Sequence, residues 1–272
     1  MNNLKKIGLS ALAGSLVSVS AHAAEFSVSG SASITMDRPS KEMVTGNDFS
    51  MGDSLGFNAS GETDGGLGVA VYYEIDNGAL DDYDMTLSGD WGSLKFNGSG
   101  SSSALSAIDD VTPNAYEEAW DIVDYDGTLT VGAPTVIGGG GGTNMFIYTS
   151  PSFSGATLTA AYQNDGGAAA IADSYHDFAV AISPEMVEGL TLGFASGEVP
   201  VAGTDLAKDN STMYVKYAIG GFTVGYQVSE SDHDTASSSL DSTAYGITYA
   251  VNDDFSVGYS YHETEFDAAA SN

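Results

Sequence analysis

The feature that most constrains this chain is a period of two in its apolar residues, repeated from end to end. From Phe26 to Met36 every second residue is apolar or small, and the residues between them are polar. Successive side chains of a β-strand point to opposite faces, so this pattern predicts a strand with one apolar and one polar face. The same pattern returns clearly at residues 67–75, 222–228 and 255–261.

Weaker segments of the same kind fill the intervals between these strands. They lie at residues 55–59, 85–87, 94–96, 146–148, 156–162, 178–182, 190–194, 213–219 and 245–251. Together they make about thirteen candidate strands of the amphipathic type found in transmembrane barrels. The 34 Gly among 272 residues also favour an all-β chain. After the N-terminal segment no stretch approaches about 18 consecutive apolar residues, so any membrane crossing must use strands.

The links between these segments alternate in length. Short links are expected at residues 63–66, 89–92, 151–155, 184–189, 220–221 and 252–254. Long polar links are expected at residues 38–53, 76–82, 101–143, 164–173, 198–210 and 231–240. A soluble β-sandwich has no reason to sort its links by length, whereas outer-membrane barrels have short periplasmic turns and long extracellular loops. The pattern therefore favours a transmembrane antiparallel β-barrel over a sandwich.

The N-terminal segment and the net charge limit where the protein can be located and which partners it can bind. Lys5 and Lys6 precede an apolar run at residues 7–19, and residues 21–23 form an A-x-A cleavage site, as in a secretory signal. We expect residues 1–23 to be a signal peptide and residues 24–272 to be the barrel domain. Without the signal, 5 basic and 37 acidic residues remain, a formal charge of 5 − 37 = −32. Such a charge excludes a nucleic-acid partner.

No catalytic constellation is visible in the sequence. There is no Cys, no G-x-S-x-G elbow, no paired His and Glu on a helix and no phosphate-binding Gly loop. His176 and His262 fall on predicted strands, with His176 on the apolar face, and we interpret both as wall residues. The chain is therefore predicted not to be an enzyme. The alternative to a channel is a secreted acidic, β-rich surface protein or adhesin, which would predict a tandem repeat that is not visible here.

Three motifs make the chain similar to the general-diffusion porins of Gram-negative bacteria, especially the alphaproteobacterial, Rhodobacter-like branch. They are AEFSVSG at residues 24–30, GDWGSLKF at residues 89–96 and YTSPSFSG at residues 148–155. The resemblance implies a barrel of about 16 strands, usually a homotrimer, in the lipid of the outer membrane. It implies a water-filled channel for passive diffusion of ions and small hydrophilic solutes, reached by export through the periplasm. It also implies that the third long loop folds into the lumen.

Residues 101–143 are this third loop, and its acidic residues are the predicted pore constriction. They are Asp109, Asp110, Glu117, Glu118, Asp121, Asp124 and Asp126. Carboxylates in a narrow, partly desolvated passage favour cations. Calcium is an open alternative at Asp109, Asp110, Asp121 and Asp124, because hard cations take oxygen ligands. No other cofactor is expected.

Porins of this kind carry a basic cluster on the wall opposite the loop, and this chain departs from that pattern. In the family that this chain resembles, Arg occupies alternate lumen-facing positions of the strand after the loop. Met145 and Ile147 occupy those positions here. The pore-wall basic residues expected here are Arg38, Lys95 and Lys216. The balance predicts a cation-preferring pore.

The C-terminal end also departs from the family pattern. The last candidate strand ends near His262 and a polar tail follows. About three strands of the expected barrel are therefore missing, and we expect a C-terminal truncation rather than a smaller barrel.

Overall fold

The computed structural model describes residues 25–36, 49–114, 137–139, 142–164, 174–200, 207–233, 239–253 and 255–266. These residues form 13 strands, which pair in sequence order as one antiparallel sheet. The strands are β1 (Glu25–Met36), β2 (Phe49–Glu62), β3 (Gly68–Asp76), β4 (Ala79–Gly89), β5 (Gly92–Ser99), β6 (Met145–Thr149), β7 (Ala156–Gln163), β8 (Tyr175–Ile182), β9 (Leu190–Pro200), β10 (Ala207–Ile219), β11 (Phe222–His233), β12 (Leu240–Asn252) and β13 (Phe255–Phe266). The predicted all-β, antiparallel class is confirmed.

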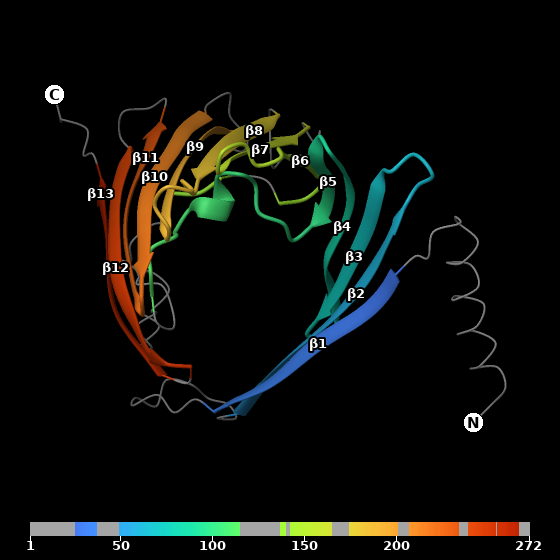
Figure 1. Cartoon of the computed structure of the whole chain (residues 1–272), viewed down its shortest axis with the longest axis horizontal. Helices are drawn as coiled ribbons and strands as arrows, with labels where there is room; N and C mark the ends of the chain where they lie inside the picture. Colours follow the sequence, from blue (N-terminus) through green and yellow to red (C-terminus); the bar gives the residue numbers. More distant parts are fainter. Residues whose placement is uncertain are drawn as a thin grey trace.

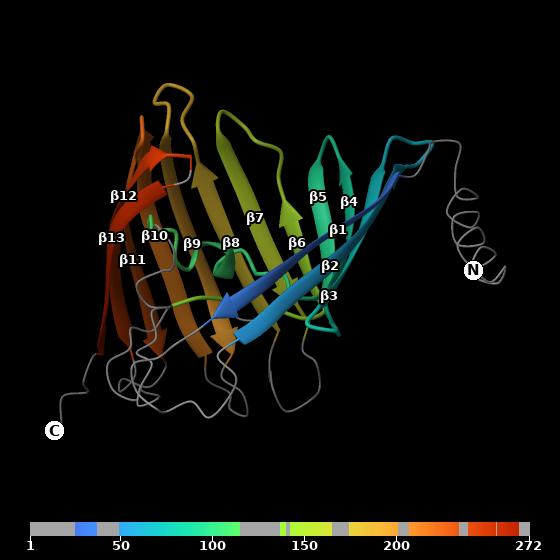
Figure 2. The same ribbon diagram turned by 90° about the horizontal axis from the view of Figure 1, so that it is seen from below.

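The sheet curls around a central space, with one short 3-10 helix, η1 (Ser106–Ile108), inside the curl (Figure 1). The strands run tilted past one another in the perpendicular view (Figure 2). Within the described residues, β1 pairs with β2 alone and β13 with β12 alone, so these two strands are the edges of the sheet. No helix in the described ranges is long and apolar enough to cross a membrane.

The alternation of the sequence becomes the two faces of this sheet. On β11 the apolar Phe222 is 47% exposed on the outside, whereas Gln227 is 2% exposed on the inside. The outer face carries exposed large apolar or aromatic side chains on every strand except β5, whose Phe96 is half-buried on the same face against Phe146 of β6. A soluble protein would cover such a surface, so this outward apolar face indicates contact with lipid.

One predicted link is absent from the structure, and several strands end at residues other than those predicted. Residues 76–82 were expected to form a long polar link, but β3 and β4 meet in a two-residue turn at Asn77 and Gly78. Both residues have positive φ, 47° and 80°. Asn-Gly is the sequence preferred by such a hairpin turn, because both central residues must adopt positive φ. The acidic residues after the turn belong to strand β4, so their polarity did not mark a loop.

Each of the other predicted links falls between two strands, and three of the long ones, those after β1, β9 and β11, are shorter than expected. β2 begins at Phe49 and β9 extends to Pro200, so both strands continue beyond their apolar stretches. β13 likewise runs to Phe266 rather than ending near His262. The predicted signal peptide, residues 1–23, lies outside the described residues, and the division of the chain into signal and barrel stays a prediction.

Candidate functional site

The interior of the curled sheet is the candidate site, because the polar face of the strands turns inward there. Asn210 and Thr212 on β10, Gln227 and Ser229 on β11, and Ser242 on β12 are all buried on this face. A buried polar group must find a hydrogen-bond partner to avoid a free-energy penalty. Part of the third loop, residues 101–114, crosses this face and supplies partners (Figure 1). The predicted in-folded loop is confirmed.

The Asp177 carboxylate is the first anchor of the loop. It projects inward from β8 and is 4% exposed. Its two oxygens accept hydrogen bonds from the backbone N–H groups of Ala104 at 3.2 Å and Leu105 at 2.7 Å. The Tyr175 hydroxyl donates to the same carboxylate at 2.6 Å. Hydrogen bonds to an ionised acceptor are stronger than neutral ones, so this carboxylate holds the turn that leads into η1.

The Gln227 amide is the second anchor, at the end of η1. Its Oε1 accepts a hydrogen bond from Val111 N at 2.8 Å. Its Nε2 donates to the carbonyl oxygens of Ile108 at 2.8 Å and Asp109 at 2.9 Å. A primary amide carries both a donor and an acceptor, so one side chain satisfies backbone groups on both sides of Asp110.

Amide side chains also hold the returning part of the loop. Asn210 Nδ2 donates to Gly138 O at 2.8 Å, and Asn97 Nδ2 donates to Gly142 O at 2.9 Å. Gln163 Nε2 donates to the carbonyl oxygen of Thr143. The loop is therefore fastened to five strands, β5, β7, β8, β10 and β11, by side chains that the sheet directs inward.

Small residues let the loop lie close to the wall. Ala104 and Leu105 pack against Ala179 and Ala195 in a buried apolar cluster. Further along, a Cβ atom on Gly246 of β12 would overlap the backbone of Pro113. A larger side chain at these inward positions would push the loop into the central space.

The structure describes only two of the predicted constriction acids, Asp109 and Asp110, and both are partly buried in the docked loop. Asp109 Oδ1 accepts a hydrogen bond from Asp110 N at 2.8 Å. Asp110 Oδ1 accepts from Thr112 N at 2.9 Å and Thr112 Oγ1 at 2.6 Å. Outside the described residues lie Glu117, Glu118, Asp121, Asp124, Asp126 and Arg38. Their role as a constriction stays a prediction.

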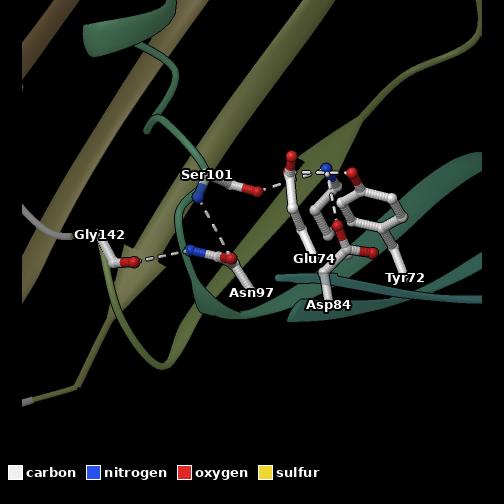
Figure 3. A network of polar contacts seen from close by, with 7 residues as sticks. Tyr72, Glu74, Asp84, Asn97, Ser101 and Gly142 are labelled. Carbon is white, nitrogen blue, oxygen red and sulfur yellow. Dashed lines mark hydrogen bonds and ion pairs between the residues drawn. The ribbon is translucent and has the colours of Figure 1, made fainter. Parts of the chain in front are cut away.

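The two described basic residues that were predicted on the wall occupy inward positions. Lys95 Nζ on β5 lies 3.4 Å from Asp84 Oδ2 and donates to Ser101 Oγ at 3.4 Å (Figure 3). Lys216 shares the inward face of β10 with Thr212. Met145 and Ile147 are 0% and 8% exposed and pack in the interior, as expected for residues that replace the Arg of the family pattern at lumen positions.

Sequence reasoning missed a row of inward acids on the wall formed by β3 and β4. Glu74 accepts a hydrogen bond from Tyr72 OH at 2.9 Å (Figure 3). It accepts another from the Ser54 hydroxyl. Asp84 pairs with Lys95 on the neighbouring strand. In the sequence, Glu74 and Asp84 alternate with Tyr73 and Met85, which face outward. This alternation could have identified the two acids as inward residues. Lys208 was missed as well, although it shares the inward face of β10 with Asn210.

Metal binding has limited support in this interior. Within the described ranges, no group of three or more His, Cys, Asp or Glu residues could hold a metal ion. Two of the four residues named for calcium, Asp121 and Asp124, lie outside those ranges. Calcium therefore stays a prediction.

Comparison with known proteins relates this arrangement to channels. The family model described as Gram-negative porin matches residues 8–272. The anion-selective porin from Comamonas acidovorans superposes with a TM-score of 0.59 at 16% identity, covering 89% of this chain and 80% of that chain. OmpT of Vibrio cholerae in its trimer form superposes with a TM-score of 0.58 at 15% identity, covering 92% and 80%. No curated protein sequence gives a match. At these identities the two structures show the fold alone.

Proposed function

This chain belongs to the Gram-negative porin family, and we propose that it is an outer-membrane diffusion channel that passes small hydrophilic solutes and prefers cations. The observation that carries the proposal is the docked loop. A sheet with an apolar outside curls around a polar interior, and residues 101–114 are fastened across that interior by Asp177 and Gln227. A loop held across the interior narrows the passage. The Rhodobacter-like branch stays a prediction.

The charges of the interior support the cation preference. Glu74 and Asp84 face the inside from one wall, and Asp109 and Asp110 lie in the loop docked on other strands. Lys95 is paired with Asp84, which offsets its charge. Carboxylates lining a narrow passage raise the local cation concentration, because low-dielectric walls focus their field. We do not assign a catalytic step to this interior.

Assembly and export belong to the same proposal. OmpT of Vibrio cholerae is described as a trimer, and we propose that this chain also forms a homotrimer in outer-membrane lipid. Residues 1–23 would direct its export to the periplasm before insertion. The competing proposal of a secreted adhesin predicts release from the cell instead of partition with outer membranes.

Conductance of the full-length protein in a planar bilayer under a KCl gradient tests the channel directly. We expect stepwise conductance and a reversal potential of the sign given by K⁺ preference. Conductance with Cl⁻ preference would keep the channel and reject the charge argument. Correctly folded protein that gives no conductance, together with release into the medium, would favour the adhesin.

A further inference from the structure

The outer face of the sheet, away from the channel interior, carries a crevice over strands β9 to β12. Its volume is about 270 Å³, and its apolar lining comes from Phe194 on β9, Met213 on β10 and Val228 on β11. These side chains point outward, because they alternate with inward residues that are more buried on the same strands. Two acids, Glu230 on β11 and Asp241 on β12, line one end of the crevice. The crevice therefore joins an apolar floor to an acidic end.

A second crevice continues the first along the β10–β11 pair. It has a volume of about 210 Å³ and is lined by Val215, Tyr217, Val224, Gly225 and Tyr226. The outward cross-strand pair that follows Met213 and Val228 is the first pair of this second crevice. The two crevices therefore follow one line on the outer face, from the acidic end toward the turn that joins β10 to β11.

The length of this line matches one layer of lipid. Glu230 and Val224 are six positions apart on β11, which is about 20 Å at the rise of a strand. Strands of transmembrane barrels are tilted by about 35–45°, so the line spans about 15 Å of depth. One leaflet has the same depth, since the hydrocarbon core is about 30 Å thick. An acyl chain of one leaflet therefore fits along the crevices with its head group beside Glu230 and Asp241.

The charge at the acidic end selects the kind of head group. Glu230 is directly opposite Asp241, so two like charges lie side by side where the apolar face ends. The Lys residues of the described ranges all face inward and offset neither acid: Lys95, Lys208 and Lys216. Charges next to lipid are weakly screened, because the effective dielectric constant is lower there than in water. A phosphate would add a third negative charge, whereas both carboxylates attract an ammonium group.

We propose that these crevices bind a lipid whose head group carries a primary ammonium and a net positive charge. Its acyl chain lies along β10 and β11, and its ammonium group donates hydrogen bonds to the Glu230 and Asp241 carboxylates. The lipid belongs to the leaflet on the side of the long links, because the two acids lie toward the strand ends that those links join. The site is separate from the channel interior and requires only that the outer face contacts lipid.

Native mass spectrometry of the full-length protein in detergent micelles tests the site, with octadecylamine as the probe. We expect the double variant Glu230→Gln, Asp241→Asn to bind octadecylamine about tenfold more weakly than wild type, as for two partly exposed charge interactions. Octadecanol has the same chain without the charge, and it should bind wild type as weakly as the amine binds this variant. Equal binding of octadecylamine by wild type and the double variant would overturn the proposal.

A charge control and a steric variant separate the site from general attraction to an acidic surface. Glu198→Gln removes an exposed outward acid of β9 that lines neither crevice, so it should bind octadecylamine like wild type. Val224→Phe fills the second crevice without changing a charge. It should weaken octadecylamine and leave octylamine unchanged, because the shorter chain ends in the first crevice. A loss in Glu198→Gln equal to that in the double variant would overturn the proposal, as would an equal loss of both amines in Val224→Phe.

The competing occupant is a lipid phosphate bridged to the two acids by a divalent cation. Phosphatidylglycerol with and without Mg²⁺ is the probe for it, and we expect its binding to be the same in wild type and the double variant. Mg²⁺-dependent binding that the double variant abolishes would overturn the ammonium proposal. The readout needs no conductance, so a failure here is distinguishable from a failure of the channel proposal.

Discussion

The Asp177 side chain is where a single residue has the largest expected effect on the loop. Asp177→Asn removes the charge while keeping one oxygen, so only one of Ala104 N and Leu105 N keeps a good acceptor. We expect docking of residues 103–108 to weaken by about 1–2 kcal/mol. Hydrogen exchange of that segment measures the loss. Asp209→Asn, an exposed outward residue of β10, should leave the exchange of this segment unchanged, and a similar effect there would contradict the anchoring role.

The cation preference also depends on single residues. Replacing Glu74 with Gln removes an inward carboxylate, and we expect the K⁺ to Cl⁻ permeability ratio to fall by about twofold, as for one screened charge near the ion path. Asp84→Asn should act more strongly, because it also leaves the Lys95 ammonium without its partner. The reversal potential in a KCl gradient reports both. Asp241→Asn, on the outer face, is the control, and an equal effect from it would contradict the assignment of the path.

Gly246 gives a steric prediction for the same interior. Gly246→Ala places a Cβ atom against the Pro113 backbone, so the loop must move away from β12. Overpacking of this kind costs about 1–3 kcal/mol. We expect a changed single-channel conductance with a barrel that still folds, as judged by heat-modifiable gel migration. Gly65→Ala in the turn after β2, where the nearest atom is 4.0 Å away, should conduct like wild type.

Among the elements, β11, β12 and β13 carry acids that are opposed on the outer face. Glu230 is directly opposite Asp241, and Asp241 is directly opposite Glu265. Like charges directly opposite one another destabilise a sheet by about 0.2–1 kcal/mol per pair. Asp241→Asn should therefore raise the unfolding temperature on gels at low salt. The gain should disappear in about 1 M NaCl, where the Debye length is about 3 Å; a salt-independent gain would point to another cause.

At the scale of the whole molecule, the curled sheet gives the interior two different walls. β5, β7, β8 and β10–β12 receive the loop with neutral amides, small residues and one buried carboxylate. On β3 and β4, the acids Glu74 and Asp84 pair with other wall residues and hold none of the described loop segments. The passage therefore runs between a docked loop and an acidic wall. The selectivity variants probe this wall, whereas the docking variants probe the loop, so the two sets of experiments are independent.

The sequence by itself determined the strands and their two faces, because alternation is a local property of a few adjoining residues. Phe222 outside and Gln227 inside follow from their positions on one strand. The Asn77-Gly78 dipeptide is also a local turn signal, but residues 76–82 were wrongly predicted as a long link because the acids that follow were interpreted as loop residues. The resemblance of three short motifs to a family was enough to expect the in-folded loop. No local pattern could identify its anchors.

Only the tertiary structure decided which inward residues matter to the loop. Asp177 holds Leu105 although 72 positions separate them, and Gln227 holds Val111 across 116 positions. Such pairs depend on the register of every intervening strand, which brings distant parts of the chain to one place on the inner face. Alternation fixes the direction in which a side chain points, whereas the fold fixes what it meets there.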